Sequence, residues 1–162
     1  MPMAYIALGS NLDQPMHQLQ QAVQTIKKHP SMQWILGSWV YISAPIGPQD
    51  QDDFHNACIV IATELSPEQL LLVLQSIEQQ QQRKRTRHWG PRTLDLDIIY
   101  YTGESRQTPE LSLPHPLATQ RLFVLLPLQD LAFDKLLQNQ PLDHWIQACC
   151  TQILKQTSVR LV

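Results

Sequence analysis

The chain has 162 residues, of which 43% are hydrophobic and 16% charged, and this composition predicts one soluble globular domain, residues 1–162, with a sizeable core. The formal net charge of −2 argues against a general nucleic-acid binder or a membrane-surface protein, because such proteins carry a broad excess of basic residues. The lack of a signal peptide, of a long apolar segment and of metal-site spacing among the three cysteines favours a cytoplasmic protein, which we expect to be a monomer.

The first part of the chain predicts strands that alternate with helices. Residues 3–8 form a short apolar run typical of a buried strand. A helix is predicted next, because apolar residues recur at helical spacing at Leu19, Ala22, Val23 and Ile26. Residues 33–43 predict a second strand. Residues 44–53, with two prolines and a glycine, predict a long loop of the kind that often covers a site.

The middle of the chain repeats this alternation. Residues 56–63 carry few charges and predict a third strand that is buried on both faces. A helix is expected to begin after Ser66, because Pro67 suits the first helical position and Gln69 stands where a capping box requires it. Residues 93–101 predict a fourth strand by their alternation and their aliphatic and aromatic content.

The predicted order is strand, helix, strand, strand, helix, strand. This order is that of the ferredoxin-like βαββαβ core, an α+β arrangement with helices on one face of an antiparallel sheet. The C-terminal part predicts a helix near residues 120–131, broken or kinked by Pro127, and another near residues 142–154. We expect these helices to cover the second face of the sheet, which gives a three-layer αβα sandwich.

Residues 83–92 concentrate positive charge in a loop. They hold five of the twelve Lys and Arg residues of the chain and no acid. A planar guanidinium grips two phosphate oxygens at once, so the best candidates for binding a polyanion are Arg83, Arg85 and Arg92. Lys84 and Arg87 are better interpreted as a solvated face. Trp89 either packs the loop onto the core or closes over a ligand.

Two acids follow this loop on the predicted strand. Residues two apart on a strand face the same side, so Asp95 and Asp97 are expected to point together, about 7 Å apart along the backbone. Two adjacent carboxylates are the kind of ligand that Mg²⁺ takes together with water and substrate phosphates. Alone, the pair has the alternative interpretation of two solvated acids. Because the basic loop lies directly before the two acids, the sequence favours a site for phosphoryl transfer, in which the acids hold Mg²⁺ and the basic residues hold a polyanion.

Three further side chains lie in or beside predicted loops, and two of them have both a structural and a functional interpretation. Phe54 and Asn56 place an amide beside an aromatic platform, which suits a flat heteroaromatic ligand, although a core phenylalanine with a turn asparagine is more common. His115 is held between prolines in a loop and has no role that its own residue type would establish.

Residues 88–99 (HWGPRTLDLDII) resemble the signature of the 6-hydroxymethyl-7,8-dihydropterin pyrophosphokinase family of folate biosynthesis. The resemblance spans nearly the whole chain, because similar motifs stand in the same order at residues 4–12, 47–51, 54–56, 113–116 and 121–123. It implies transfer of pyrophosphate from ATP to the hydroxymethyl oxygen of the dihydropterin, with release of AMP. The implied substrates are small molecules, with no nucleic-acid or membrane partner.

The same resemblance implies roles for individual residues. Two Mg²⁺ ions are expected at Asp95 and Asp97, and the catalytic set adds Arg83 and Arg92. The implied ATP contacts are Gln75, Glu78, Arg83, Arg85, Trp89, Arg92, Ile98, His115 and Arg121. The dihydropterin is expected between two aromatic rings and against nearby polar and backbone groups, a set consisting of Ser43, Pro45, Ile46, Phe54, Asn56, Trp89 and Phe123. No side chain need act as a strong general base, because the metal lowers the pKa of the attacking hydroxyl.

Three positions depart from the family pattern. Gln82 stands where glycine is usual, His88 where arginine is usual and Ala44 where proline is common. The first two put loop flexibility and nucleotide affinity in question. The residues alone also leave two other functions open. One is a ferredoxin-like RNA-binding module, against which the acidic net charge counts. The other is a Mg²⁺-dependent nucleotidyltransferase, which two spaced aspartates do not exclude.

Overall fold

The structure, a computed structural model, describes residues 1–45, 47, 50–81 and 93–162. Six strands form one antiparallel sheet in the order β5–β1–β4–β3–β8, with β2 also paired to β4. The strands are β1 (Met3–Ser10), β2 (Met32–Gly37), β3 (Trp39–Ser43), β4 (Phe54–Thr63), β5 (Asp95–Tyr101) and β8 (Lys155–Arg160).

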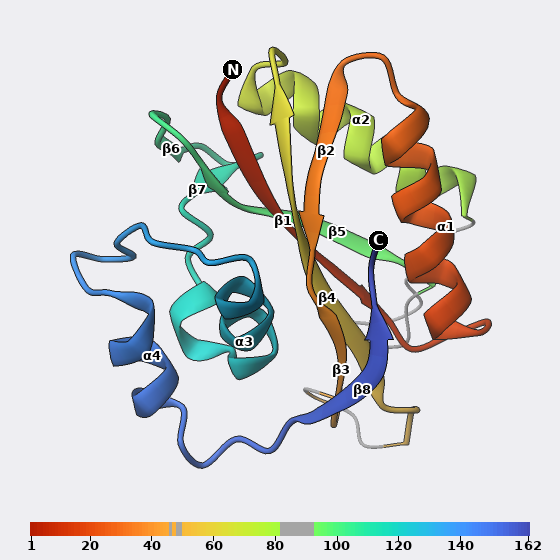
Figure 1. The fold of residues 1–162 in the computed structure, drawn as a ribbon, viewed down its shortest axis with the longest axis vertical. Coiled ribbons are helices and arrows are strands. Elements are labelled where there is room, and N and C mark those ends of the chain that lie inside the picture. Colours follow the sequence, from red (N-terminus) through yellow and green to blue (C-terminus); the bar gives the residue numbers. More distant parts are fainter. Residues whose placement is uncertain (46, 48–49, 82–92) are drawn as a thin grey trace.

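Helices cover both faces of this sheet (Figure 1). Helices α1 (Pro15–Lys28) and α2 (Pro67–Gln80) lie on one face, and α3 (Leu122–Asp130) and α4 (Leu142–Ala148) lie on the other. A short 3₁₀ helix, η1 (Ala118–Gln120), precedes α3, and a small hairpin joins β6 (Arg106–Gln107) to β7 (Ser112–Leu113). The predicted α+β class and its three layers are confirmed, because the antiparallel sheet lies between two helical layers.

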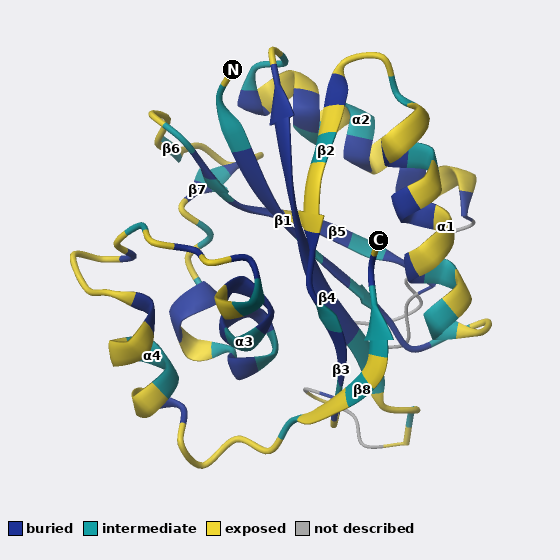
Figure 2. Ribbon diagram, viewed as in Figure 1, coloured by how far each residue is buried: buried dark blue, intermediate teal, exposed yellow. Residues whose placement is uncertain are grey.

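Each face of the sheet has its own core, and the central strands are buried on both sides (Figure 2). Ala4, Ile6 and Leu8 of β1 pack against the buried stripes of α1 and α2. Tyr5, from the opposite face of the same strand, packs under α3 and contacts Phe133 with ring centroids 4.9 Å apart. Strand β1 therefore alternates between two cores, which explains why its sequence is apolar from Met3 to Leu8.

Helix α2 begins, and helix α1 ends, where the sequence predicts. The Ser66 hydroxyl accepts a hydrogen bond from the Gln69 N–H at 3.1 Å, and the Gln69 side chain accepts one from the Ser66 N–H at 2.9 Å. This reciprocal pair is the expected capping box of α2. Helix α1 ends with Lys27 and Lys28, whose charges suit the negative end of the helix dipole.

The predicted strand over residues 33–43 is two strands, because Ser38 interrupts it. The Ser38 N–H donates to the Cys58 carbonyl, and the Ser38 hydroxyl accepts from the Cys58 N–H, both at 2.9 Å. A side-chain oxygen thus replaces a backbone partner at this point. The preceding Gly37 lies so close to the C-terminal segment that a Cβ would stand 2.2 Å from the Leu161 carbonyl oxygen.

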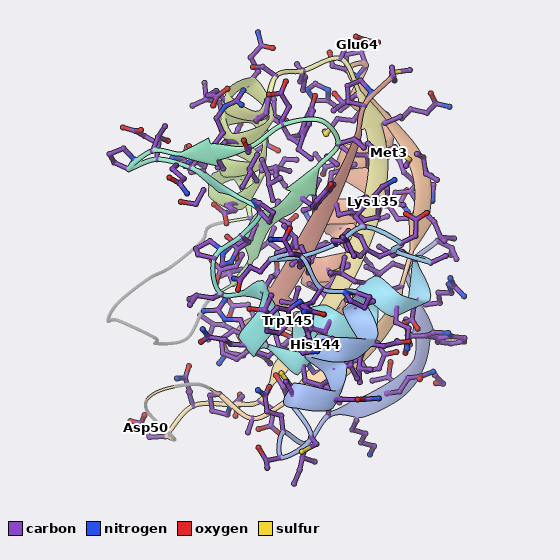
Figure 3. The ribbon with its side chains drawn as sticks, turned by 90° about the vertical axis from the view of Figure 1, so that its left-hand side faces the viewer. Met3, Asp50, Glu64, Lys135, His144 and Trp145 are labelled. Carbon is purple, nitrogen blue, oxygen red and sulfur yellow. The ribbon has the colours of Figure 1, made fainter. Side chains whose placement is uncertain are left out.

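The C-terminal prediction was wrong in part. Helix α4 ends at Ala148, six residues before the predicted end, and the chain then forms β8 at the edge of the sheet beside β3. The Trp145 indole N–H donates to the Leu137 carbonyl at 2.8 Å, and His144 packs edge-on against the same indole (Figure 3). The indole hydrogen bond fastens α4 to the segment before it. In the described ranges, no helix combines the length and the apolar character that crossing a membrane requires.

Candidate active site

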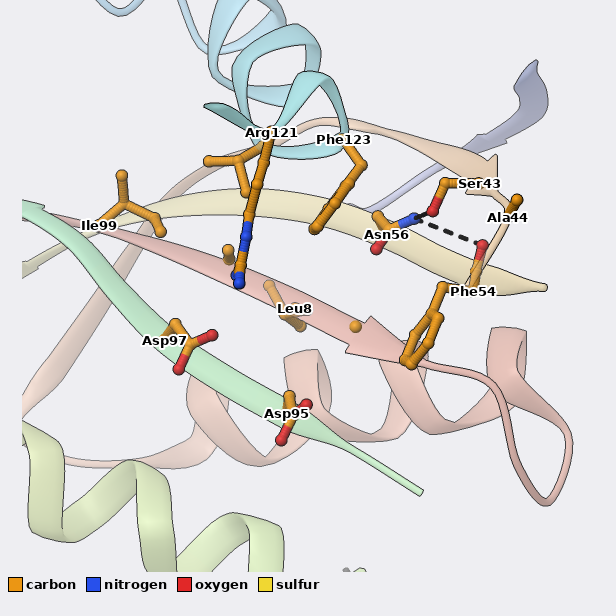
Figure 4. Close-up of a pocket in the computed structure, with 13 residues that line it drawn as sticks. Leu8, Ser43, Ala44, Phe54, Asn56, Asp95, Asp97, Ile99, Arg121 and Phe123 are labelled. Carbon is orange, nitrogen blue, oxygen red and sulfur yellow. Dashed lines mark hydrogen bonds between the residues drawn. The ribbon is translucent and has the colours of Figure 1, made fainter. Parts of the chain in front are cut away.

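A pocket opens on the sheet face that α3 covers, where the start of α3 passes over β4, β1 and β5 (Figure 4). Its lining comes from segments far apart in the sequence and consists of Ala7, Leu8, Gly9, Ser43, Ala44, Phe54, Asn56, Asp95, Asp97, Ile99, Arg121, Phe123 and Val124. Seven of these are sequence-predicted site residues: Ser43, Phe54, Asn56, Asp95, Asp97, Arg121 and Phe123. The fold therefore brings the predicted acids, amide and aromatic rings into one cavity.

Asp95 and Asp97 both line this pocket from β5, as their spacing predicts. Leu94, Leu96 and Ile98 point into the core under α1 and α2. Asp95 is half-buried and Asp97 is exposed, so solvent or a ligand reaches both carboxylates. Two carboxylates that face the same side of a strand repel each other unless a cation neutralises them.

Glu78 supports the acid-bearing strand from behind. Its carboxylate is buried, with 7% of the residue exposed, and accepts a hydrogen bond from the Leu96 N–H at 2.8 Å. Leu96 lies between the two aspartates on β5, which is an edge strand of the sheet. Glu78 thus satisfies a backbone group on the side of β5 where the described residues place no further strand, and it fixes the distance between α2 and the two acids.

The opposite side of the pocket is an amide with a defined orientation. Asn56 is 4% exposed, and its amide N–H donates to the Ser43 hydroxyl at 2.8 Å and more weakly, at 3.4 Å, to the carbonyls of Tyr41 and Phe54. Because three acceptors surround the nitrogen, the amide cannot turn over without placing its oxygen against them. The oxygen Oδ1 of Asn56 is therefore the atom presented to the pocket, beside the ring of Phe54 (Figure 4).

The start of α3 supplies a cation and a second ring. Arg121 extends into the pocket on the side of Asp97, and its guanidinium carbon lies 5.6 Å from the centroid of the Phe123 ring (Figure 4). His115 lies nearby, and its pKa is lowered, mainly by burial. The negative charge of Asp97 opposes this shift, and the positive charge of Arg121 adds to it. The Nδ1 of His115 accepts from the Leu117 N–H at 3.2 Å. These groups place positive charge and a neutral imidazole beside the carboxylates.

Other predicted site residues lie outside this pocket. Gln75 lines a separate groove between α2 and the β6–β7 hairpin. Ile98 is buried in the core of the opposite face, so a ligand on the pocket side would meet only its backbone. Pro45 is buried beside the pocket. The predicted residues Ile46, Arg83, Arg85, Trp89 and Arg92 lie outside the described residues.

The small and apolar part of the lining was not predicted from the sequence. Ala7 and Gly9 of β1, Ile99 of β5 and Val124 of α3 carry no functional group, so residue type gave no reason to choose them. Strand alternation does offer a signal for β1. Residues 7 and 9 share a face with Tyr5, and the decrease in size from Tyr to Ala to Gly indicates a face that opens toward one end.

The donor set suits a hard cation that is shared with a ligand. In the parts of the chain that the structure describes, no cluster of three or more His, Cys, Asp or Glu side chains would enclose a metal by itself. Asp95 and Asp97 offer carboxylate oxygens only, on the open side of a pocket. Mg²⁺ is commonly bound in this way, by one or two carboxylates with the remaining positions filled by water and phosphate oxygens.

Comparisons with known proteins agree on one family. A family model described as 7,8-dihydro-6-hydroxymethylpterin-pyrophosphokinase (HPPK) matches residues 5–133. The 2-amino-4-hydroxy-6-hydroxymethyldihydropteridine pyrophosphokinase of Haemophilus influenzae is 45% identical over 153 residues, which cover 94% of this chain and 91% of that protein. The protein of the same name from Pseudomonas aeruginosa is 43% identical over 146 residues, covering 90% of each.

Solved structures show the same fold. The chain aligns with the crystal structure of Plasmodium falciparum HPPK-DHPS at a TM-score of 0.66 and 14% sequence identity. The alignment covers 91% of this chain and 43% of that one, so this chain corresponds to less than half of the solved protein. A second structure of HPPK-DHPS, in complex with substrates, aligns at a TM-score of 0.70 and 11% identity, covering 91% and 43% respectively.

Proposed function

This chain belongs to the 7,8-dihydro-6-hydroxymethylpterin-pyrophosphokinase family, and we propose that the pocket described above carries out the reaction of that family. The enzyme transfers pyrophosphate from ATP to the hydroxymethyl group of 6-hydroxymethyl-7,8-dihydropterin, giving AMP and the pterin diphosphate for folate biosynthesis. One observation carries the assignment to this pocket: the paired carboxylates of β5 and the amide and ring of β4 face one cavity, with only β1 between them.

The amide side of the pocket is assigned to the dihydropterin. Phe54 and Phe123 provide aromatic faces for a flat bicyclic ring, and the oriented Oδ1 of Asn56 accepts from a ring N–H. Ser43, Pro45 and Ile46 are assigned backbone contacts to the same ring. An aromatic platform with an amide of fixed orientation discriminates strongly, because a ligand without the matching donor leaves a buried polar group unpaired.

The carboxylate side is assigned to the triphosphate. Asp95 and Asp97 would hold two Mg²⁺ ions, which when bound neutralise phosphate oxygens and favour attack at phosphorus. Arg121 reaches the same space and is positioned to bind a phosphate oxygen. The remaining residues assigned to ATP are Gln75, Glu78, Arg83, Arg85, Trp89, Arg92, Ile98 and His115, with Arg83 and Arg92 counted as catalytic and Trp89 closing over both substrates.

The spacing of the strands suits a direct transfer between the two substrates. Gly9 of β1 pairs with Asn56 on one side and with Asp95 on the other, so these two side chains are about 10 Å apart across two strand spacings. A pterin ring at the amide would thus direct its hydroxymethyl group toward the carboxylates. Its oxygen forms a bond to the β-phosphorus while the bond from that phosphorus to the α,β-bridging oxygen breaks, and AMP leaves.

Catalysis in this scheme comes mainly from positioning and charge. The residues hold the hydroxyl in line with the leaving oxygen, neutralise the phosphates and exclude water, so no covalent enzyme intermediate is required. The hydroxyl proton passes to solvent or to a phosphate oxygen, and no side chain in the pocket is assigned as a strong base. The neutral His115 is assigned a nucleotide contact rather than proton transfer.

We also propose a domain organisation, an oligomeric state and a cellular compartment for the protein. We assign residues 1–162 to a single domain that acts as a monomer on small-molecule substrates. The cytoplasm is assigned as its compartment, since Cys58, Cys149 and Cys150 are free thiols, which suits a reducing environment.

A product assay tests the reaction. The protein is incubated with ATP and Mg²⁺, with and without 6-hydroxymethyl-7,8-dihydropterin, and AMP, ADP and free pyrophosphate are resolved. The proposal predicts AMP that depends on the pterin, without free pyrophosphate. ADP would indicate a simple kinase, and free pyrophosphate would indicate the alternative nucleotidyltransferase.

A further inference from the structure

The floor of the pocket is the strand β1, and the side chains on its pocket face decrease in size from Tyr5 to Gly9. Tyr5, Ala7 and Gly9 share the face that α3 covers. Tyr5 is buried against the rings of Tyr100 and Phe133, whereas Ala7 and Gly9 line the pocket. The strand thus changes from core to open floor within five residues.

Gly9 stands at the centre of this floor. In the register of the sheet it pairs with Asn56 of β4 and with Asp95 of β5, so it lies directly between the amide and the first carboxylate. Any ligand that contacts both of these side chains must cross Gly9. Its backbone does not need a glycine here, because Gly9 is not among the described residues with positive φ.

A side chain at this position would fill space that no other group occupies. A Cβ built on Gly9 would stand 3.6 Å from Asn56 Oδ1, and 4.0 Å from both the Phe54 ring carbon Cδ1 and the His55 carbonyl oxygen. These are ordinary van der Waals distances, so a methyl group would fit without strain. It would, however, lie in front of the amide oxygen and beside the ring, where the ligand has to lie.

We infer that Gly9 is a specificity-determining residue of this pocket, whose missing side chain admits a flat ring to the Asn56 oxygen and the Phe54 face. This inference rests on the proposed function, because it takes the ring to be that of the dihydropterin. The glycine selects for a thin, planar ligand edge at the amide. A methyl group added at Gly9 would leave the phosphate side unaffected, since no atom of Asp95 or Asp97 is among its three nearest neighbours.

The substitution Gly9→Ala tests this inference by separating ring binding from folding. One methyl group in a fitted pocket changes discrimination by about 10–200-fold, so the KM for the dihydropterin should rise at least about tenfold. The KM for ATP should stay within about twofold of wild type, because the phosphate side does not change. The melting temperature should stay equal or rise slightly, since alanine restricts the unfolded chain more than glycine does.

Gly103→Ala is the matched control. It adds the same methyl group in an exposed turn where no atom lies within 4 Å, but at a φ of +77° that disfavours a side chain. This variant should lose stability and keep the wild-type KM for the dihydropterin. A Gly9→Ala protein whose KM for the dihydropterin stays within twofold of wild type would overturn the inference. If the wild-type protein itself gives no pterin-dependent AMP, the proposed function fails instead.

Discussion

The buried carboxylate of Glu78 offers a quantitative test of how the fold positions the two acids. Glu78→Ala removes the acceptor of the Leu96 N–H, a bond of 2.8 Å at a residue that is 7% exposed. Hydrogen bonds to charged groups contribute about 1.5–3 kcal/mol, and among the described residues no strand lies on that side of β5 to replace the partner. Glu78→Gln keeps an oxygen acceptor and should lose only about 1 kcal/mol.

These free energies convert into measurable melting shifts. For a chain of this size 1 kcal/mol corresponds to about 2–4 °C, so Glu78→Ala should melt about 3–12 °C below wild type and Glu78→Gln about 2–4 °C below it. Turnover should fall more in the alanine variant than in the glutamine variant, because Asp95 and Asp97 lose their fixed distance from α2. Glu64→Gln, at an exposed position, serves as the control. An unchanged melting temperature in Glu78→Ala would refute the supporting role, and a raised KM for ATP in the same variant would leave only the nucleotide contact assigned to Glu78 above.

Two further predictions concern charge. Asp97→Asn should lower turnover by more than about 100-fold through loss of a metal ligand, yet change stability by less than about 0.5 kcal/mol because Asp97 is exposed. AMP release measures the first effect and the melting temperature the second, with the exposed Asp143→Asn variant as the control. Activity within tenfold of wild type would contradict the metal assignment. Burial lowers the pKa of His55 below its usual 6.5, and the opposing effect of the Asp53 charge is smaller. As the pH falls below 6.5, the unfolded chain therefore binds a proton at His55 before the folded chain does, and the folded state loses stability. The urea midpoint should therefore drop between pH 7 and about pH 5, and His55→Gln should reduce that drop; an equally steep profile in the variant would refute this contribution.

Local patterns in the sequence were sufficient to predict much of the frame. The capping box at Ser66 and Gln69 depends on residues three apart, and the common face of Asp95 and Asp97 depends on strand geometry alone. Both were predicted from neighbouring residues and confirmed. The family resemblance extended this to residues such as Phe54 and Phe123, which are 69 positions apart and meet in one pocket.

Features that depend on distant contacts were not predictable in this way. Strand β8 has the polar sequence KQTSVR and forms because β3 offers an edge to it. The break at Ser38 depends on hydrogen bonds with Cys58, twenty positions away. The orientation of the Asn56 amide likewise depends on Ser43, and the Glu78 bond depends on Leu96. In each case the deciding partner is distant in the sequence, and no local pattern links the two residues or strands.

The most direct test of the account follows the phosphorus atoms. ATP labelled at the β-phosphorus is incubated with the protein, Mg²⁺ and 6-hydroxymethyl-7,8-dihydropterin, and the pterin product is isolated. Transfer of an intact pyrophosphoryl group at this pocket predicts that the label appears in the pterin product in equal amount to the AMP formed. A label that remains in ADP, or that appears as free pyrophosphate, would contradict the assigned reaction.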